Sequence, residues 1–81
     1  MLQELTGQQK VVGVKQSRRA IREGRAAQVY LATNADPALT GPLEELCEAQ
    51  GVPVDMRFTM EELGKAAGIQ VGATVVDVLN A

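Results

Sequence analysis

The chain has 81 residues, a formal net charge of −2 and 46% hydrophobic residues, with one tyrosine, one phenylalanine and no tryptophan. Such a length and composition predict one small domain, residues 1–81, with an aliphatic core. The single cysteine excludes an internal disulfide, and the absence of histidine argues against zinc sites and histidine-based acid–base chemistry. We therefore expect no metal and no cofactor. Without a signal-peptide pattern or a membrane-length apolar run, we expect a cytoplasmic protein that does not enter a membrane.

The N-terminal third predicts a strand followed by a helix. The first nine residues are compatible with a short helix carrying Leu2 and Leu5. The β-branched run KVVGV, residues 10–14, predicts a short buried strand. A helical pattern follows from Lys15 to Glu23, and Gly24 is well placed to end that helix.

The middle of the chain predicts a strand, a turn and a second helix. AQVYLAT, residues 27–33, is a strand closed by the turn NADP, in which Asp36 suits a turn or cap role better than that of a catalytic base. We expect the helix to begin near Thr40, because Pro42 is tolerated in a first turn but breaks a helix interior. Gly51 ends this helix.

The second helix is amphipathic, with an apolar face and an acidic face. Its cysteine lies on the apolar face and is best interpreted as a small core residue. Its glutamates lie on an exposed face without a catalytic companion, so they suit solubility better than catalysis. The apolar face consists of Leu39, Leu43, Leu46 and Cys47, and the acidic face of Glu44, Glu45 and Glu48.

The last third predicts a strand, a helix and a final strand. VPVDMRF, residues 52–58, alternates apolar and polar residues as a half-exposed strand does. Thr59 and Glu62 have the spacing of a capping box and open a helix. ATVVDVL, residues 73–79, is a buried strand with one polar residue, Asp77. The alternation of strands and helices predicts an α/β sandwich with helices on both faces of the sheet.

The positive charge is concentrated in one segment. Residues 10–25 hold six of the eight basic residues and a single acidic one, whereas residues 26–81 hold two basic and eight acidic residues. A patch of one sign is typical of sites for anionic partners, including nucleic acids. The six basic residues are Lys10, Lys15, Arg18, Arg19, Arg22 and Arg25.

Four of these residues share one face of the first helix and form what we call the basic stripe. The only local acid, Glu23, lies off the stripe by its spacing. Like charges at these spacings, and basic residues near a helix start, both cost stability until an anion binds. The alternative is a solvated face neutralised by the acidic helix 40–50. The stripe consists of Lys15, Arg18, Arg19 and Arg22, spaced i, i+3, i+4 and i+7.

Two further features bear on binding. The backbone N–H groups of residues 14–16 open a helix directly after a strand, which suits phosphate or carboxylate, although neither a Walker loop nor a dinucleotide fingerprint is present. The segment GIQVGAT, residues 68–74, places Ile69 and Val71 between glycines. These two side chains either pack inward or contact a partner from an exposed loop.

Four blocks, GVKQSRRAIREG, VYLATNADP, LCEAQGVPV and LGKAAGIQVGA, resemble the ribosomal L-seven-Ae/L-thirty-e family of kink-turn RNA-binding proteins, above all its short bacterial members. The resemblance runs from about Val11 to the C-terminus. It implies a three-layer α/β/α sandwich around a mixed four-stranded sheet. It also implies binding to structured RNA with a kink-turn, where tandem sheared G·A pairs flank a bulge, and stabilisation of the bent RNA.

The resemblance implies two RNA contacts. In the first contact, the helix start enters the groove at the G·A pairs. The family pattern there is Gly-x-Asn-Glu, followed by a Lys three residues on. In this chain Lys15 stands for the Asn, Gln16 for the Glu and Arg19 for the Lys. An amide at Gln16 both donates and accepts, unlike a carboxylate, which alters the base contacts. Met60 stands where some members carry a lysine. The helix-start contact comprises Gly13, Val14, Lys15, Gln16 and Arg19, with Arg18 and Arg22 near phosphates, and the loop contact at the bulge comprises Ile69, Gln70, Val71, Gly72 and Ala73.

Three functions are compared on this basis. A monomeric RNA-binding module is favoured, with the ribosome as a further candidate partner. A protein-interaction module that docks an acidic partner through the basic helix is the alternative. An enzyme that uses the helix-start anion site is the least favoured, because neither a histidine nor a nucleophile–base pair is present.

Overall fold

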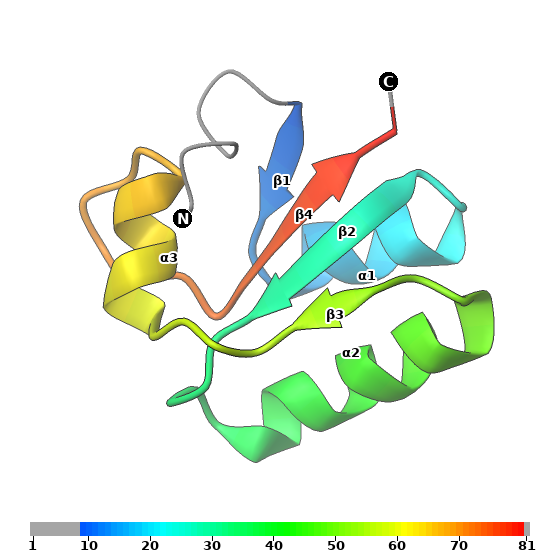
Figure 1. Ribbon diagram of the computed structural model, residues 1–81, viewed down its shortest axis with the longest axis horizontal. Helices are drawn as coiled ribbons and strands as arrows, with labels where there is room; N and C mark the ends of the chain where they lie inside the picture. Colours follow the sequence, from blue (N-terminus) through cyan, green and yellow to red (C-terminus); the bar gives the residue numbers. More distant parts are fainter. Residues whose placement is uncertain (1–8, 81) are drawn as a thin grey trace.

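The computed structural model describes residues 9–80, so the expected helix with Leu2 and Leu5 lies outside the described residues. Strands and helices alternate along the chain, as predicted (Figure 1). In chain order the elements are β1 (Lys10–Val12), α1 (Val14–Arg22), β2 (Ala26–Leu31), α2 (Pro37–Gln50), β3 (Val54–Asp55), α3 (Met60–Ala66) and β4 (Val75–Leu79).

The four strands form one mixed sheet in the order β1-β4-β2-β3. The last strand, β4, lies between β1 and β2 and is antiparallel to both, with Val76 opposite Val12 and Val75 opposite Leu31. The short strand β3 is parallel to β2 at the sheet edge. The mixed four-stranded sheet is therefore confirmed.

Helices cover both faces of the sheet, which confirms the three-layer sandwich. Residues of β2 and β4 point alternately to the two faces, because side chains alternate along a strand. A β-bulge between Ala26 and Gln28 shifts this alternation, so that Ala26 also faces α1 and α2. The core under α1 and α2 contains Ile21, Val29, Leu31, Leu43, Cys47 and Val75, and the core under α3 contains Tyr30, Ala32, Leu63, Ala73 and Val76.

The predicted start of α2 near residue 40 is wrong, because the helix already begins at Pro37. Asp36 caps it by accepting a hydrogen bond from the Ala38 N–H at 2.9 Å, which confirms the cap role. Pro42 consequently lies inside the helix. It removes the hydrogen bond to the carbonyl four residues earlier, that of Ala38, and this residue is exposed to water.

The apolar face of α2 differs from the prediction at one position. Leu39 is 43% exposed, whereas Leu43 and Cys47 are buried and Leu46 is half-buried. Thr40, one residue further on, is buried instead of Leu39. Leu39 instead borders the groove between α1 and α2, beside Leu43 and Leu46.

The strand predicted over residues 52–58 is much shorter, at Val54–Asp55. Pro53 lacks an N–H group and contributes only its carbonyl, which accepts from the Val29 N–H at 3.0 Å. After the strand, the carboxylate of Asp55 accepts from the Arg57 N–H at 3.0 Å and turns the chain away from the sheet. The alternating pattern of this segment reflects packing of Phe58 and Met56 rather than a longer strand.

Candidate nucleic-acid interface

The start of α1 presents backbone N–H groups that have no partner in the described part of the chain. Gly13 precedes the helix with a φ of 104°, which favours glycine, and its N–H donates to the Val75 carbonyl at 3.1 Å. The helix has no side-chain cap and no acid in its first turn. Among residues 9–80, the N–H groups of Val14, Lys15 and Gln16 therefore stay available to an anion at the positive end of the helix dipole.

The exposed face of α1 carries the basic stripe, as predicted. Ser17, Ala20 and Ile21 are buried against the sheet and α2, so the opposite side of the helix faces water. The exposed side chains line a shallow hollow of about 240 Å³. These side chains are Lys15, Gln16, Arg18, Arg19 and Arg22.

The prediction that Glu23 lies apart from the stripe is wrong. Its carboxylate accepts from Nε of Arg19 at 3.2 Å and from Nε of Arg25 at 2.8 Å. The hydrogen bond from Arg19, and then that from Arg25, hold the pKa of Glu23 below its usual value. Arg19 is thus the one member of the stripe with an acidic partner in the described part of the chain.

Neutralisation of the stripe by the glutamates of α2 is not observed. Within residues 9–80, Lys15, Arg18 and Arg22 form no ion pair. Arg18 and Arg22 instead border a groove of about 260 Å³ between α1 and α2. The other residues of this groove are Val14, Ala38, Leu39, Pro42, Leu43 and Leu46.

A buried polar pair lies beneath α1. Ser17 donates its hydroxyl hydrogen to Oδ1 of Asp77 at 2.5 Å, and both residues are fully buried. The second carboxylate oxygen, Oδ2, has no partner among the described residues. Burial raises the pKa of Asp77 to about 6, and the bond from Ser17 offsets only part of that rise.

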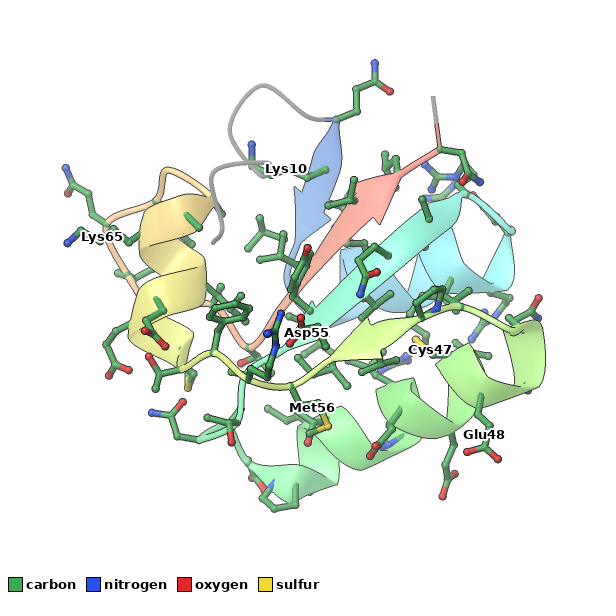
Figure 2. All side chains as sticks on the ribbon, in the orientation of Figure 1. Lys10, Cys47, Glu48, Asp55, Met56 and Lys65 are labelled. Atoms are coloured by element: carbon green, nitrogen blue, oxygen red, sulfur yellow. The ribbon has the colours of Figure 1, made fainter. Side chains whose placement is uncertain are left out.

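Cys47 is a core residue, as predicted. Figure 2 shows its side chain between α2 and the sheet, whereas Glu48 points away from the molecule. Burial, and then the nearby carboxylates of Asp77 and Glu44, raise the pKa of the Cys47 thiol to about 11. The thiol is therefore protonated at neutral pH and suits packing rather than nucleophilic chemistry.

The segment from Gly68 to Ala73, here called the 68–73 loop, joins α3 to β4 and is held by backbone contacts. The Ala73 N–H donates to the Met60 carbonyl at 3.0 Å, and the Ile69 N–H to the Gly64 carbonyl at 3.0 Å. A Cβ atom on Gly64 would overlap the carbonyl oxygen of Val71. A side chain at position 64 is thus incompatible with this loop path.

The two apolar residues of this loop have different environments. Ile69 is half-buried and packs on the core under α3, whereas Val71 is 71% exposed. Gln70 and Gly72 are also exposed, and Ala73 is buried. Of the two interpretations, inward packing holds for Ile69 and exposure for Val71.

The α1 start, the 68–73 loop and the turn after β2 meet at one end of the sheet, where the arrowheads of β1 and β2 point (Figure 1). Gly13 bonds to Val75 at the start of β4. The Ala32 N–H at the end of β2 donates to the Thr74 carbonyl at 2.9 Å. The structure therefore brings both sequence-predicted contact segments to the same end.

Two residues of this end were not assigned from the sequence. Asn34 accepts from the Met60 N–H at 2.8 Å and so joins the turn to α3. Gly64 admits the loop against α3. A glycine inside a helix costs stability relative to alanine, so Gly64 within MEELGKA carried a signal of close packing, whereas nothing in the sequence singled out Asn34 from other turn formers.

Other kinds of site have no counterpart in the described residues. Residues 9–80 contain no group of three or more histidine, cysteine, aspartate or glutamate side chains arranged to hold a metal ion. No helix in that range has the length and apolar character needed to cross a bilayer.

The open helix start, the basic stripe along α1 and the exposed Val71 give this α/β/α sandwich a surface suited to an anionic macromolecule. The sequence identifies its family. The chain belongs to the ribosomal protein L7Ae/L30e/S12e/Gadd45 family, which matches residues 2–81.

Relatives of similar length carry RNA-binding names. A Geobacillus protein (strain WCH70) named as an RNA-binding protein is 43% identical over 70 residues, which cover 86% of this chain and 85% of that protein. A Caldanaerobacter subterraneus protein with the same description is 40% identical over 72 residues, 88% of each chain.

Solved structures share the fold. The 15.5 kD RNA-binding protein of Giardia lamblia superimposes with a TM-score of 0.89 over 99% of this chain and 68% of that one, at 24% identity. A Bacillus halodurans protein of unknown function gives a TM-score of 0.82 over 90% of this chain and 73% of that one, at 26% identity.

Proposed function

We propose that this protein is a monomeric RNA-binding module that recognises a kink-turn, with tandem sheared G·A pairs next to a bulge, and stabilises the bent RNA. The observation that carries the proposal is the convergence of the α1 start and the 68–73 loop at one sheet end. Family membership and relatives named RNA-binding proteins support it. Ribosomal RNA is one candidate for the structured target.

In this proposal the start of α1 reads the G·A pairs. Lys15 donates from a flexible ammonium, and the Gln16 amide both donates and accepts at base edges. Arg18, Arg19 and Arg22 neutralise the phosphates of the two backbones that the kink brings together. Lys15, Arg18 and Arg22 have no ion pair to break among the described residues, which favours such contacts.

The 68–73 loop supplies the second contact, at the bulge. Exposed Val71 covers unstacked bases with apolar surface, a recognised way to read RNA bulges. Gln70 and the backbone at Gly72 are also exposed and open to RNA. Ile69 and Ala73 contribute mainly by holding the loop, because Ile69 packs inward and Ala73 is buried.

Binding alone performs this function. A protein that binds the bent RNA more tightly than the extended RNA shifts the population toward the bent state. No covalent step is needed, in agreement with relatives that are named RNA-binding proteins.

The test is a titration against a kink-turn RNA and against the same RNA with its G·A pairs replaced by Watson–Crick pairs. We expect clearly tighter binding to the kink-turn. Gln16→Ala and Arg19→Ala should reduce the ratio of the two affinities, since each removes a helix-start contact. Equal affinity of the unmodified protein for both RNAs would contradict kink-turn recognition, and an unchanged ratio in the variants would contradict the residue assignment.

The groove between α1 and α2 favours a second candidate, a protein partner. Arg18 and Arg22 border it on one side, and aliphatic side chains including the exposed Leu39 border it on the other. An acidic segment with apolar side chains would fit both. This candidate predicts that Leu39→Gln, which removes the apolar surface without changing the net charge, strongly weakens partner binding and leaves the affinity for kink-turn RNA unchanged.

A further inference from the structure

Asn34 occupies a junction between the turn after β2 and the start of α3. Its side-chain oxygen Oδ1 accepts from the Met60 N–H at 2.8 Å, and its Nδ2 donates to Oε1 of Glu61 at 3.3 Å. Met60 is the first residue of α3, and its N–H is one of the donors that a helix start leaves without an internal partner. A residue 26 positions earlier in the chain therefore caps this helix in addition to its own capping box.

Met60 also fixes the end of the 68–73 loop. Its carbonyl accepts from the Ala73 N–H at 3.0 Å. A Cβ atom on Gly72 would lie 3.1 Å from Cβ of Met60, so the loop backbone runs closely past this residue. The side chain of Asn34 and the loop thus hold opposite backbone groups of the same residue.

Two backbone hydrogen bonds flank α3 and the loop, and the side chain of Asn34 makes the direct contact between the turn and the helix itself. The Thr33 N–H donates to the Phe58 carbonyl at 2.8 Å just before the helix, and the Ala32 N–H donates to the Thr74 carbonyl just after the loop. Both are backbone bonds of the sheet end and place the two ends of the segment 59–73. Between these two bonds, the side chain of Asn34 holds the first residue of α3 against the turn.

We infer that Asn34 is a positioning residue for the 68–73 loop: through Met60 it sets how far Val71 reaches from the sheet end toward the bulge nucleotides. The reach of Val71 toward bulge nucleotides rests on the proposed RNA function. The positioning of the loop by Asn34 concerns the protein alone. Asn34 is exposed, and its amide is occupied by two hydrogen bonds within the protein. Its effect on the loop runs through Met60 and needs no contact of Asn34 itself with RNA.

The amide offers a matched set of variants. Asn34→Ala removes both hydrogen bonds without changing the net charge. Asn34→Asp combined with Glu61→Gln keeps the acceptor for the Met60 N–H and reverses the donor and acceptor of the second bond, again without a change in net charge. The unmodified protein and the two variants have the same net charge and the same generic attraction to RNA. Differences in RNA affinity between them therefore report on the position of the loop.

The first measurement uses the free protein. Amide hydrogen exchange should quicken at Met60 and Ala73 by about tenfold in Asn34→Ala, because the local opening of the loop becomes easier. The Leu63 amide in the middle of α3 and the amides of α1 serve as internal references. The paired variant should return exchange at Ala73 to that of the unmodified protein. Unchanged exchange at Ala73 in Asn34→Ala would overturn the inference.

The second measurement uses a kink-turn RNA with 2-aminopurine in the bulge and a bulge-free duplex of the same length. We expect Asn34→Ala to weaken kink-turn binding about five- to tenfold, to change the 2-aminopurine signal of the complex and to leave duplex binding unchanged. The paired variant should restore both. Equal weakening for both RNAs would show a general defect and overturn the inference. If the unmodified protein does not distinguish the RNAs, the proposed function fails, and the exchange experiment still decides whether Asn34 positions the loop.

Discussion

The two sides of the sheet build the candidate interface in different ways. On the α1 side, charged side chains project from a regular helix, and most of them bind nothing else in the described protein. On the α3 side, backbone hydrogen bonds and closely packed glycines hold the 68–73 loop. The α1 surface can therefore change residue by residue without altering the fold, whereas the loop surface depends on the path of the main chain.

The largest expected effect lies beneath α1 and concerns stability against pH. Because the pKa of Asp77 is raised to about 6 from 3.8, the folded state favours the protonated carboxyl. The stability that this group contributes is complete below about pH 4 and is lost as pH rises toward 6, a change of about 3 kcal/mol in the free energy of unfolding. Urea unfolding from pH 4 to pH 7 measures it.

The variant Asp77→Asn isolates this contribution. The amide keeps an acceptor for the Ser17 hydroxyl and does not titrate. The difference in unfolding free energy between the unmodified protein and the variant should therefore slope through this pH range. Parallel curves would show that the pKa of Asp77 is the same in the folded and unfolded states and contradict the assignment.

The next largest effect tests the main-chain dependence of the loop. Gly64→Ala places a methyl group against the carbonyl of Val71 and should cost about 2 kcal/mol of stability, since a well-packed contact must shift. Gly41→Ala is the matched control, because that helical glycine has open space around it. It should stabilise by about 0.5–1 kcal/mol. Equal effects in urea unfolding would mean that the loop adapts freely.

A smaller effect is expected at the start of α3. Thr59 accepts from the Glu62 N–H at 3.2 Å, and the Glu62 carboxylate accepts from the Thr59 N–H at 2.8 Å. Thr59→Ala removes half of this capping box and should lower the unfolding free energy by about 1 kcal/mol. Thr59→Ser, which retains the hydroxyl, should recover most of it. A loss that serine does not recover would point to the methyl group rather than the cap.

The smallest expected effect tests the phosphate contacts of the basic stripe on α1. Arg22→Gln should weaken RNA binding only a few-fold and reduce the slope of log K against log salt by about 0.7–0.9, the share of one phosphate. Arg25→Gln makes the same charge change outside the basic stripe, at a residue that pairs with Glu23. The slope of log K against log salt for Arg25→Gln should equal that of the unmodified protein. The same slope for both variants would indicate attraction by net charge alone.

Sequence reasoning succeeded where the signal is local. The capping box at Thr59 and Glu62, the cap role of Asp36 and the exposed basic stripe depend on spacing within a few residues. The family blocks added the layer order and the mixed sheet, since strand order depends on contacts between distant segments. The length of β3 escaped prediction because the side chain of Asp55 ends it through a turn.

The contacts that could not be predicted join distant residues or depend on rotamers. Asn34 meets Met60 across 26 positions, and Ser17 meets Asp77 across 60. The pairing of Glu23 with Arg19 is local but depends on side-chain conformation, which spacing alone left open. The spacing of Leu39 to Leu43 places it on the apolar face, but spacing does not show that this end of the face borders an open groove and leaves Leu39 exposed.

The carboxylate of Glu23 competes with an RNA phosphate for Arg19. An RNA phosphate that takes the Nε edge of Arg19 displaces Glu23, so the affinity gained at that edge is a difference between two anions. The displaced carboxylate keeps Arg25 but loses the larger cause of its lowered pKa. RNA binding should then be accompanied by uptake of a fraction of a proton in the acidic range in which Glu23 titrates, and the complex should tighten slightly as pH falls through that range.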